Sequence, residues 1–327
     1  MQKSSNLVVK DYKTGLNTTR KFLKDRQEGT IKSLKTFSPK LDSALLGGID
    51  WNRILTIAGL SGGGKTTFLE QLKNSILEQE DVDVLSFEFE MLIEDQVTRA
   101  VSAALEIEYG ELLSAVTPMS EELEVKVNDV LTRFESKKIY YVDDVGTSSQ
   151  VIETILNFVT TRPPERGIIV TIDHVLLTRG ATNESEKTKI DELMQSLLVL
   201  KKYLASRGYN VLYITLSQLN RDIGMGERVT NPYLHYPTRN DLFAASSVYY
   251  CSDYVLIMHR PSVVDGMGEF YGPPRGSKFP KGLPVKCPAN PEHDMVYLHL
   301  IKQRFGKPLI IPYMENFKFS KIIETTI

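Results

Sequence analysis

Apolar positions along the chain follow two alternating patterns from residue 54 onward. Short runs rich in β-branched and aromatic residues indicate strands, and the stretches between them, where apolar residues recur every three or four positions, indicate helices. The helical spacing is clearest at Phe68, Leu72 and Ile76 and again over residues 190–204. The predicted strands cover residues 54–58, 82–87, 139–142, 168–172, 211–215, 254–258, 296–301 and 309–311. Several of these runs are continuously apolar, which is typical of strands covered on both faces. The pattern therefore predicts an α/β fold with a mainly parallel twisted sheet flanked by helices.

Two segments depart from this pattern. Residues 1–40 are polar and basic, and they hold so few apolar residues that a short helix there has little reason to fold alone. Residues 261–291 are crowded with Gly and Pro, which disfavour both a helix and a central strand. We therefore expect an N-terminal arm over residues 1–40, with a solvated tail as the alternative, and one domain over residues 41–327 with a surface insertion at 261–291.

The composition of the 327 residues restricts the class of protein. With 39 Lys and Arg against 41 Asp and Glu, the net charge is −2, which argues against a generally basic nucleic-acid-binding surface but allows a local basic stripe. The two cysteines, Cys251 and Cys287, cannot form a disulfide framework, so a reducing compartment is expected. The sequence has neither an apolar run of about 18 residues nor an apolar signal core, so we predict a cytoplasmic protein without a membrane partner. His235 and His293 have no cysteine partners at zinc spacing, and no metal cage is predicted from them.

A glycine-rich segment follows the first predicted strand. Residues 59–66 match the pattern G-x-x-x-x-G-K-[ST] and open a helical stretch, the context expected of a phosphate-binding loop rather than of a chance turn. In such a loop, backbone N–H groups and the helix N-terminus face the phosphates. Lys65 is expected to reach the β- and γ-phosphates, and Thr66 to hold Mg²⁺ through its hydroxyl. The residues predicted to bind ATP are Gly59, Ser61, Gly62, Gly63, Gly64, Lys65, Thr66 and Thr67.

Carboxylates follow two of the other predicted strands. Asp173 ends the apolar run 168–172, at the edge where ligands gather in open α/β sheets, and is expected to order Mg²⁺ through water. Glu88 and Glu90 follow the run 82–87 and are candidates for the base that polarises water. Their spacing of two gives them the same parity, so the pattern leaves the choice between them open.

Several motifs, taken in order, give the chain a resemblance to a known family. From about residue 30 to the C-terminus, interrupted by the insertion, it resembles the ATPase domain of the DnaB-type replicative helicases, which has a RecA-like fold. Residues 41–48 resemble the segment before the first strand of that family, and four further stretches resemble its motifs: residues 89–91 (S-L-E-M), 139–144 (I-Y-I-D-D), 216–221 (L-S-Q-L-N-R) and 302–306 (K-Q-R-N-G).

The resemblance implies roles that spacing alone does not give. It implies that Glu90 is the catalytic carboxylate, that Arg99 belongs to the active-site network, and that Gln218 senses the γ-phosphate and links it to DNA-facing loops. Lys302 and Arg304 are implied to reach the nucleotide of the neighbouring subunit, and their spacing in a predicted strand puts both on one face. The implied protein is an ATP- and Mg²⁺-dependent helicase that works on single-stranded DNA as a homo-oligomeric ring, a hexamer, with a loader or a primase as candidate partners.

The chain also departs from the family pattern. The bulky N-terminal domain of the family is not recognised, and residues 11–28 resemble only the linker helix that packs on an adjacent subunit, as in a phage-like helicase. Residues 240–246 stand where the family has S-D-L-R-E-S-G, so Phe243 and Ala244 replace an arginine and a glutamate that help to grip DNA. Asp173 is followed by His174, Val175 and Leu176 where the family has Y-L-Q.

Two loops are candidates for gripping a single strand instead. Such sites combine basic side chains with aromatic platforms for bases, although the same mixture also occurs in solvated loops. The first loop contains Arg221, Arg228, Tyr233, His235, Tyr236 and Arg239, and the second contains Arg179, Lys187 and Lys189.

Two other functions stay open at this stage. One is a recombinase-like or circadian-clock-like RecA ATPase that assembles without unwinding DNA. The other is a scaffold that uses ATP only to lock an oligomer on a partner, for which Phe243 and Ala244 are the best support. Unwinding of a forked duplex distinguishes the first from a helicase, and stimulation of hydrolysis by single-stranded DNA argues against the second.

Overall fold

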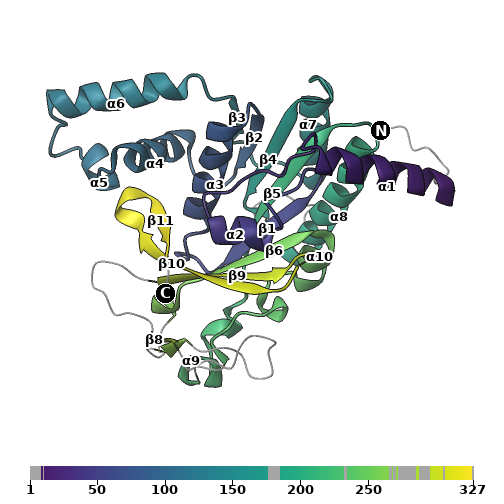
Figure 1. Cartoon of the computed structure of the whole chain (residues 1–327). Helices are drawn as coiled ribbons and strands as arrows, with labels where there is room; N and C mark the ends of the chain where they lie inside the picture. The colour runs from purple at the N-terminus through teal and green to yellow at the C-terminus, as the bar shows by residue number, and fades with distance from the viewer. Residues whose placement is uncertain are drawn as a thin grey trace.

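The computed structural model (Figure 1) describes residues 11–175, 185–231, 234–264, 295–304 and 306–325, together with residues 9, 267, 270–271 and 285–286. Most of the predicted insertion at 261–291 lies outside the described residues, as do Arg179, Tyr233, Cys287 and His293.

The described strands form a nine-stranded sheet in the order β11-β10-β9-β6-β1-β5-β4-β2-β3, and a separate pair, β7 with β8. The six strands from β6 to β3 run parallel, and β9, β10 and β11 extend the sheet beyond β6 in antiparallel fashion. The α/β fold and its mainly parallel sheet are thereby confirmed. The predicted strands agree with the observed ones, whereas β11 was not predicted. The bounds are β1 Ile54–Gly59, β2 Asp83–Glu88, β3 Ile139–Val142, β4 Gly167–Asp173, β5 Asn210–Gln218, β6 Tyr254–His259, β7 Phe270–Tyr271, β8 Val285–Lys286, β9 Met295–Lys302, β10 Leu309–Asn316 and β11 Lys321–Glu324.

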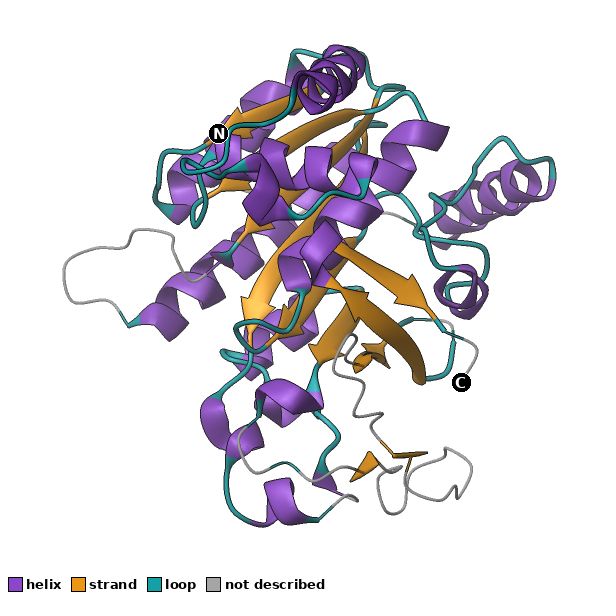
Figure 2. Ribbon diagram, turned by 90° about the vertical axis from the view of Figure 1, so that its left-hand side faces the viewer, coloured by secondary structure: helices purple, strands orange, loops and turns teal. Residues whose placement is uncertain are grey.

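Helices cover both faces of the large sheet (Figure 2). Ile168, Val170 and Ile172 of β4 pack in one core with α7 and α8, while Ile169 packs in a second core with α3. Burial on both faces therefore explains the continuous apolar run of β4. The helices are α1 Tyr12–Gln27, α2 Pro39–Ala44, α3 Lys65–Gln79, α4 Ile93–Leu105, α5 Tyr109–Leu112, α6 Glu121–Phe134, α7 Ser148–Thr160, α8 Glu186–Ala205, α9 Glu227–Thr230 and α10 Ala245–Cys251.

The direction of the parallel strands defines two edges of the sheet. At the carboxyl edge, where β1, β2, β4 and β5 end, Gly59 lies beside Gln218 and Glu88 beside Asp173. At the amino edge, the same strands begin, and β1 starts at Ile54. The candidate phosphate loop and the predicted Mg²⁺ carboxylate thus share the carboxyl edge.

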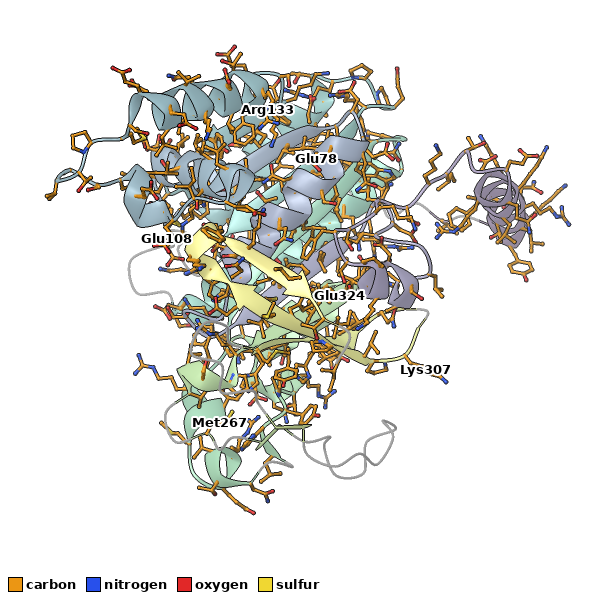
Figure 3. The ribbon with its side chains drawn as sticks, turned by 60° about the vertical axis from the view of Figure 1, so that its left-hand side comes forward. Glu78, Glu108, Arg133, Met267, Lys307 and Glu324 are labelled. Carbon is orange, nitrogen blue, oxygen red and sulfur yellow. The ribbon has the colours of Figure 1, made fainter. Side chains whose placement is uncertain are left out.

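The packed domain begins before residue 41, earlier than the boundary expected from the sequence. Leu34 is buried and pairs with Ile49 in a short antiparallel bridge. Ser38 is fully buried, and its hydroxyl accepts a hydrogen bond from the Tyr313 hydroxyl at 2.7 Å. Helix α1, by contrast, has no buried residue and projects from the body (Figures 1 and 3). Among the described residues, no helix is long and apolar enough to cross a membrane.

Candidate nucleotide-binding site

The loop between β1 and α3 has the backbone that its glycines predict. Gly62 and Gly64 have φ angles of 73° and 86°, in the left-handed region that favours glycine. A Cβ atom on Gly59 would lie 2.7 Å from the Met258 carbonyl oxygen, and one on Gly64 would lie 2.6 Å from the Phe317 ring. The loop therefore needs glycine both for its turn and for close packing, and it leads directly into the N-terminus of α3.

Lys65, Thr66 and Asp173 meet at the base of this loop. The Thr66 hydroxyl donates a hydrogen bond to Asp173 Oδ2 at 2.9 Å, and Lys65 Nζ donates to the Leu60 carbonyl at 3.0 Å. Burial raises the pKa of Asp173 to about 6, although the hydrogen bond from Thr66 opposes the shift. Burial lowers the pKa of Lys65, while the carboxylates of Asp173 and Glu90 act in the opposite direction.

These oxygens fit the requirements of Mg²⁺, which prefers oxygen ligands and keeps several waters. Asp173 Oδ1 is buried and has no hydrogen-bond partner among the described residues. An unpartnered carboxylate oxygen beside a threonine hydroxyl is a suitable place for a hydrated divalent cation. The geometry thus supports the roles predicted for Thr66 and Asp173.

The two glutamates after β2 have different surroundings. Glu88 ends β2 and is 2% exposed; it accepts hydrogen bonds from Ser86 Oγ at 2.6 Å and from Gln96 Nε2 at 2.7 Å. Burial raises its pKa to about 7, with the nearby Lys73 charge opposing the shift. Glu90 lies beyond the strand, its side chain is 56% exposed, and it lines the cavity beside the phosphate loop. The structure therefore directs Glu90, and not Glu88, toward a bound nucleotide.

Gln218 connects the cavity with the next segment of the chain. Its side chain lines the cavity, and its Nε2 atom lies 3.2 Å from His174 Nε2 in a hydrogen bond. Its backbone carbonyl accepts a hydrogen bond from the Phe243 N–H at 3.0 Å. Ala244, which precedes α10, takes a left-handed φ of 53°. A movement of Gln218 is therefore transmitted directly to the segment at 240–246.

The cavity beside the loop has a volume of about 330 Å³. Arg99 lines it, as predicted, and so do Tyr109, Phe317 and Ser320, which the sequence analysis did not select. Arg99 lies over the Tyr109 ring, with 5.8 Å from its guanidinium carbon to the ring centroid. Phe317 and Ser320 come from the turn between β10 and β11, and the missed strand β11 explains why that turn was not recognised. The other lining residues are Ser61, Gly62, Gly64, Lys65, Thr66, Thr67, Glu90, Met91 and Gln218.

Lys302 and Arg304 lie at the amino edge, away from this cavity. Strand β9 ends at Lys302, so Arg304 lies outside it and the prediction that both side chains share one strand face is wrong. Arg304 Nε donates to Asp253 Oδ1 at 2.5 Å, and Asp253 Oδ2 accepts a hydrogen bond from the Ile54 N–H at 2.9 Å. Arg304 is therefore anchored where β1 begins, whereas the phosphate loop follows the end of β1.

Figure 3 makes this separation visible. Lys307, in the turn that contains Arg304, lies on the opposite side of the molecule from Glu108, the neighbour of the cavity residue Tyr109. The Lys302 ammonium donates to the Tyr249 carbonyl at the same edge.

The loop expected to bind DNA is largely braced from within. Both terminal nitrogens of Arg228 donate to the Asp241 carboxylate, and His235 and Tyr236 are buried. These side chains are occupied by the fold, so the expectation that Arg228, His235 and Tyr236 face a nucleic acid is wrong. The side chains that remain exposed are Arg221 and Arg239 in this loop and Lys187 at the start of α8, with Lys189 partly exposed.

Comparisons with known proteins agree with this architecture. A family model of the DnaB-like helicase C-terminal domain matches residues 33–310. The chain is 27% identical over 229 residues to the probable replicative DNA helicase of Trieres chinensis, covering 70% of this chain and 48% of the relative. It is 25% identical to the replicative DNA helicase DnaB of Pasteurella multocida, covering 69% of this chain and 46% of the relative. The chain thus spans about half the length of the curated relatives it matches.

Solved structures show the same fold at low sequence identity. A solved helicase ATPase domain superposes with a TM-score of 0.75 at 18% identity, covering 97% of this chain and all of that one. A DnaB-like replicative helicase, solved in a study of its interactions with primase, gives 0.68 at 18% identity, covering 90% of this chain and 63% of that one. A KaiC-like protein from Pyrococcus horikoshii gives 0.55 at 14% identity, covering 90% of this chain and 99% of that one. The fold is therefore RecA-like.

Proposed function

The chain belongs to the family of DnaB-like helicase C-terminal domains, and from this premise we propose that it is the Mg-ATP-driven motor of a replicative DNA helicase. The observation that carries the proposal is the double connection of Gln218. Its side chain enters the nucleotide cavity while its backbone carbonyl holds the Phe243 N–H of the segment expected to face DNA. One residue thus joins the site of hydrolysis to a candidate site of DNA movement.

The cavity residues suit hydrolysis of ATP. In this proposal the loop N–H groups and Lys65 hold the β- and γ-phosphates, and Thr66 and Asp173 hold Mg²⁺, the latter through water. The bound cation neutralises charge on the phosphate oxygens. Glu90 polarises the attacking water, because its carboxylate lines the cavity and is not enclosed by hydrogen bonds as that of Glu88 is. Arg99, beside Tyr109, completes the wall of the site.

Completion of the site requires a second subunit. One carboxylate, Asp253, binds both Arg304 and the first residue of β1. The phosphate loop follows the last of the six residues of β1, so Arg304 lies on the order of 17 Å from it at about 3.3 Å per residue. Arg304 therefore cannot serve its own phosphate loop, and we propose that it and Lys302 act on the nucleotide of a neighbour in a ring, a hexamer.

Single-stranded DNA is the proposed track of this ring. The exposed cations Arg221 and Arg239 lie between Gln218 and the segment at 240–246, and supply positive charge for phosphates. A loader and a primase are candidate partners of such a motor, and the cytoplasm is its proposed compartment. The helicase-type folds match more closely than the KaiC-like one, with TM-scores of 0.75 and 0.68 against 0.55, so an ATPase without unwinding is the less favoured alternative.

The test of this function is ATP hydrolysis with and without single-stranded DNA, in the wild type and two matched variants. Glu90→Gln should bind a fluorescent ATP analogue normally but lose hydrolysis about 100-fold or more, because an amide cannot act as a base. Glu88→Gln should hydrolyse ATP within a few-fold of the wild type. Loss of hydrolysis in Glu88→Gln with retention in Glu90→Gln would reverse the assignment, and hydrolysis unaffected by DNA would contradict a DNA motor.

A further inference from the structure

His174 lies between the two residues whose roles depend on the γ-phosphate. Its imidazole is 5% exposed, and its Nε2 atom lies 3.2 Å from Gln218 Nε2 on one side and 3.4 Å from Glu90 Oε2 on the other. The sequence had singled out this position only as a departure from the family pattern. The structure shows that the departure places a ring nitrogen in contact with both Glu90 and Gln218.

A single ring nitrogen cannot satisfy both neighbours at once. Nε2 either carries a proton and donates, or presents a lone pair and accepts. As the amide of Gln218 is oriented, its N–H donates to the lone pair of His174 Nε2, and in that arrangement Nε2 has no proton to offer Glu90. Burial also lowers the pKa of His174, which favours the neutral ring with its one N–H.

The other side of the ring leaves this choice unrestricted. His174 Nδ1 is buried and has no hydrogen-bond partner among the described residues. The tautomer of a histidine is normally fixed by the hydrogen bond made at its second nitrogen. With no such bond at Nδ1, the partner present at Nε2 decides which nitrogen carries the proton. The ring keeps one proton in either arrangement, so no net proton is taken up or released.

The Glu90 carboxylate lacks another restraint. Its side chain is more than half exposed, and no hydrogen bond within the described part of the chain fixes it. A general base works only when its oxygen points at the water it activates. An N–H donor at His174 Nε2 would supply that orientation.

We propose that His174 is a positioning residue that passes its Nε2 contact from Gln218 to Glu90 when Gln218 turns toward a bound γ-phosphate. Before nucleotide binds, Gln218 occupies Nε2 and Glu90 is left unoriented. Once the Gln218 amide leaves, Nε2 takes the ring proton and donates to Glu90 Oε2. Hydrolysis is thereby armed only when the γ-phosphate has been sensed. The inference rests on the proposed function, since it assigns the coupling between the γ-phosphate and the water-activating base.

The test compares His174→Gln with His174→Asn. A glutamine side chain carries its amide N–H about as far from the backbone as Nε2, whereas an asparagine reaches only the position of Nδ1. We measure kcat and KM for DNA-stimulated hydrolysis, the Kd for a fluorescent ATP analogue, and thermal unfolding of each variant. His174→Phe, which keeps a ring without any hydrogen-bonding atom, serves as the third variant.

The expected result is a loss confined to kcat. His174→Asn and His174→Phe should lower kcat by about 10–100-fold, the scale of a misplaced catalytic group, with KM and Kd within about twofold of the wild type. His174→Gln should recover most of the wild-type kcat. Equal kcat in the Gln and Asn variants, or full kcat in His174→Phe, would overturn the inference while leaving the proposed function intact. A wild-type protein that binds ATP without hydrolysing it would instead overturn the proposed function and this inference with it.

Discussion

Asp173 shows how a single residue of the site is held against its own preference. Its side chain is 2% exposed, and burial raises the pKa of the carboxyl to about 6, well above the ordinary value of 3.8. The folded protein therefore binds a proton at this residue more tightly than the unfolded chain does. This contribution to stability is fully present below about pH 4 and is lost as the pH rises through about 6.

We therefore expect Asp173→Asn to stabilise the nucleotide-free protein at pH 8 while abolishing hydrolysis. The gain in the free energy of unfolding should be about 1–3 kcal/mol, since one pKa unit corresponds to about 1.4 kcal/mol. Below pH 6 the wild-type carboxyl is protonated, so the difference should shrink. Urea unfolding of both proteins at pH 5 and pH 8 measures it, and an equal or larger gain at pH 5 would contradict the assigned burial cost.

At the scale of elements, the sequence predicted what depends on local pattern and missed what depends on tertiary packing. The strands, the phosphate loop and the position of Asp173 follow from apolar runs and glycine spacing, and all lie as expected. Glu88 and Glu90 could not be separated, because the pattern does not show that β2 ends at Glu88. The role of Phe317 was invisible because the short strand β11 carries too few residues for a periodicity. Arg228 read as a free cation because its partner, Asp241, lies 13 residues away.

Helix α1 is the element whose packing is unexplained within one chain. No residue of it is buried, and its body leaves Tyr12, Phe22 and Leu23 exposed at 81%, 42% and 53%. An isolated helix of 16 residues is marginal in water. We therefore expect that it becomes stable against a neighbouring subunit.

Deletion of residues 1–28 should accordingly weaken assembly without unfolding the ATPase domain. The deletion removes the ion pair in which Arg26 binds Asp50 at 2.7 Å and ties the helix to the body. Sedimentation of the full-length and shortened proteins with an ATP analogue measures ring formation. The Arg26→Ala variant of the full chain separates the effect of that ion pair from the effect of the helix. Rings of unchanged stability in the shortened protein would show that the arm is a solvated tail.

At the scale of the whole molecule, the two edges of the sheet serve different subunits. The carboxyl edge presents the phosphate loop, and the amino edge presents Arg304 about one strand length away. A ring that joins the amino edge of each subunit to the carboxyl edge of the next would complete every site. Such an arrangement makes hydrolysis a property of the assembly and not of the single chain.

Mixing two inactive variants tests this arrangement. Lys65→Ala removes the phosphate contact and Arg304→Ala removes the finger, which is worth about 10³–10⁵ in rate in well-studied phosphoryl-transfer enzymes. Each variant alone should be nearly inactive, whereas mixed rings should recover part of the activity, because some boundaries then pair an intact loop with an intact finger. Absence of recovery in mixed rings, shown to form by sedimentation, would contradict independent sites completed in trans.

The central claim, that ATP hydrolysis in this chain drives DNA unwinding, is tested most directly by strand displacement. The substrate is a forked duplex with both single-stranded tails, incubated with the full chain and Mg-ATP, and Lys65→Ala serves as the matched control. The account predicts that the wild type releases the labelled strand with Mg-ATP but not with a non-hydrolysable analogue, and that Lys65→Ala releases none. DNA-stimulated hydrolysis by the wild type without release of the strand would contradict it.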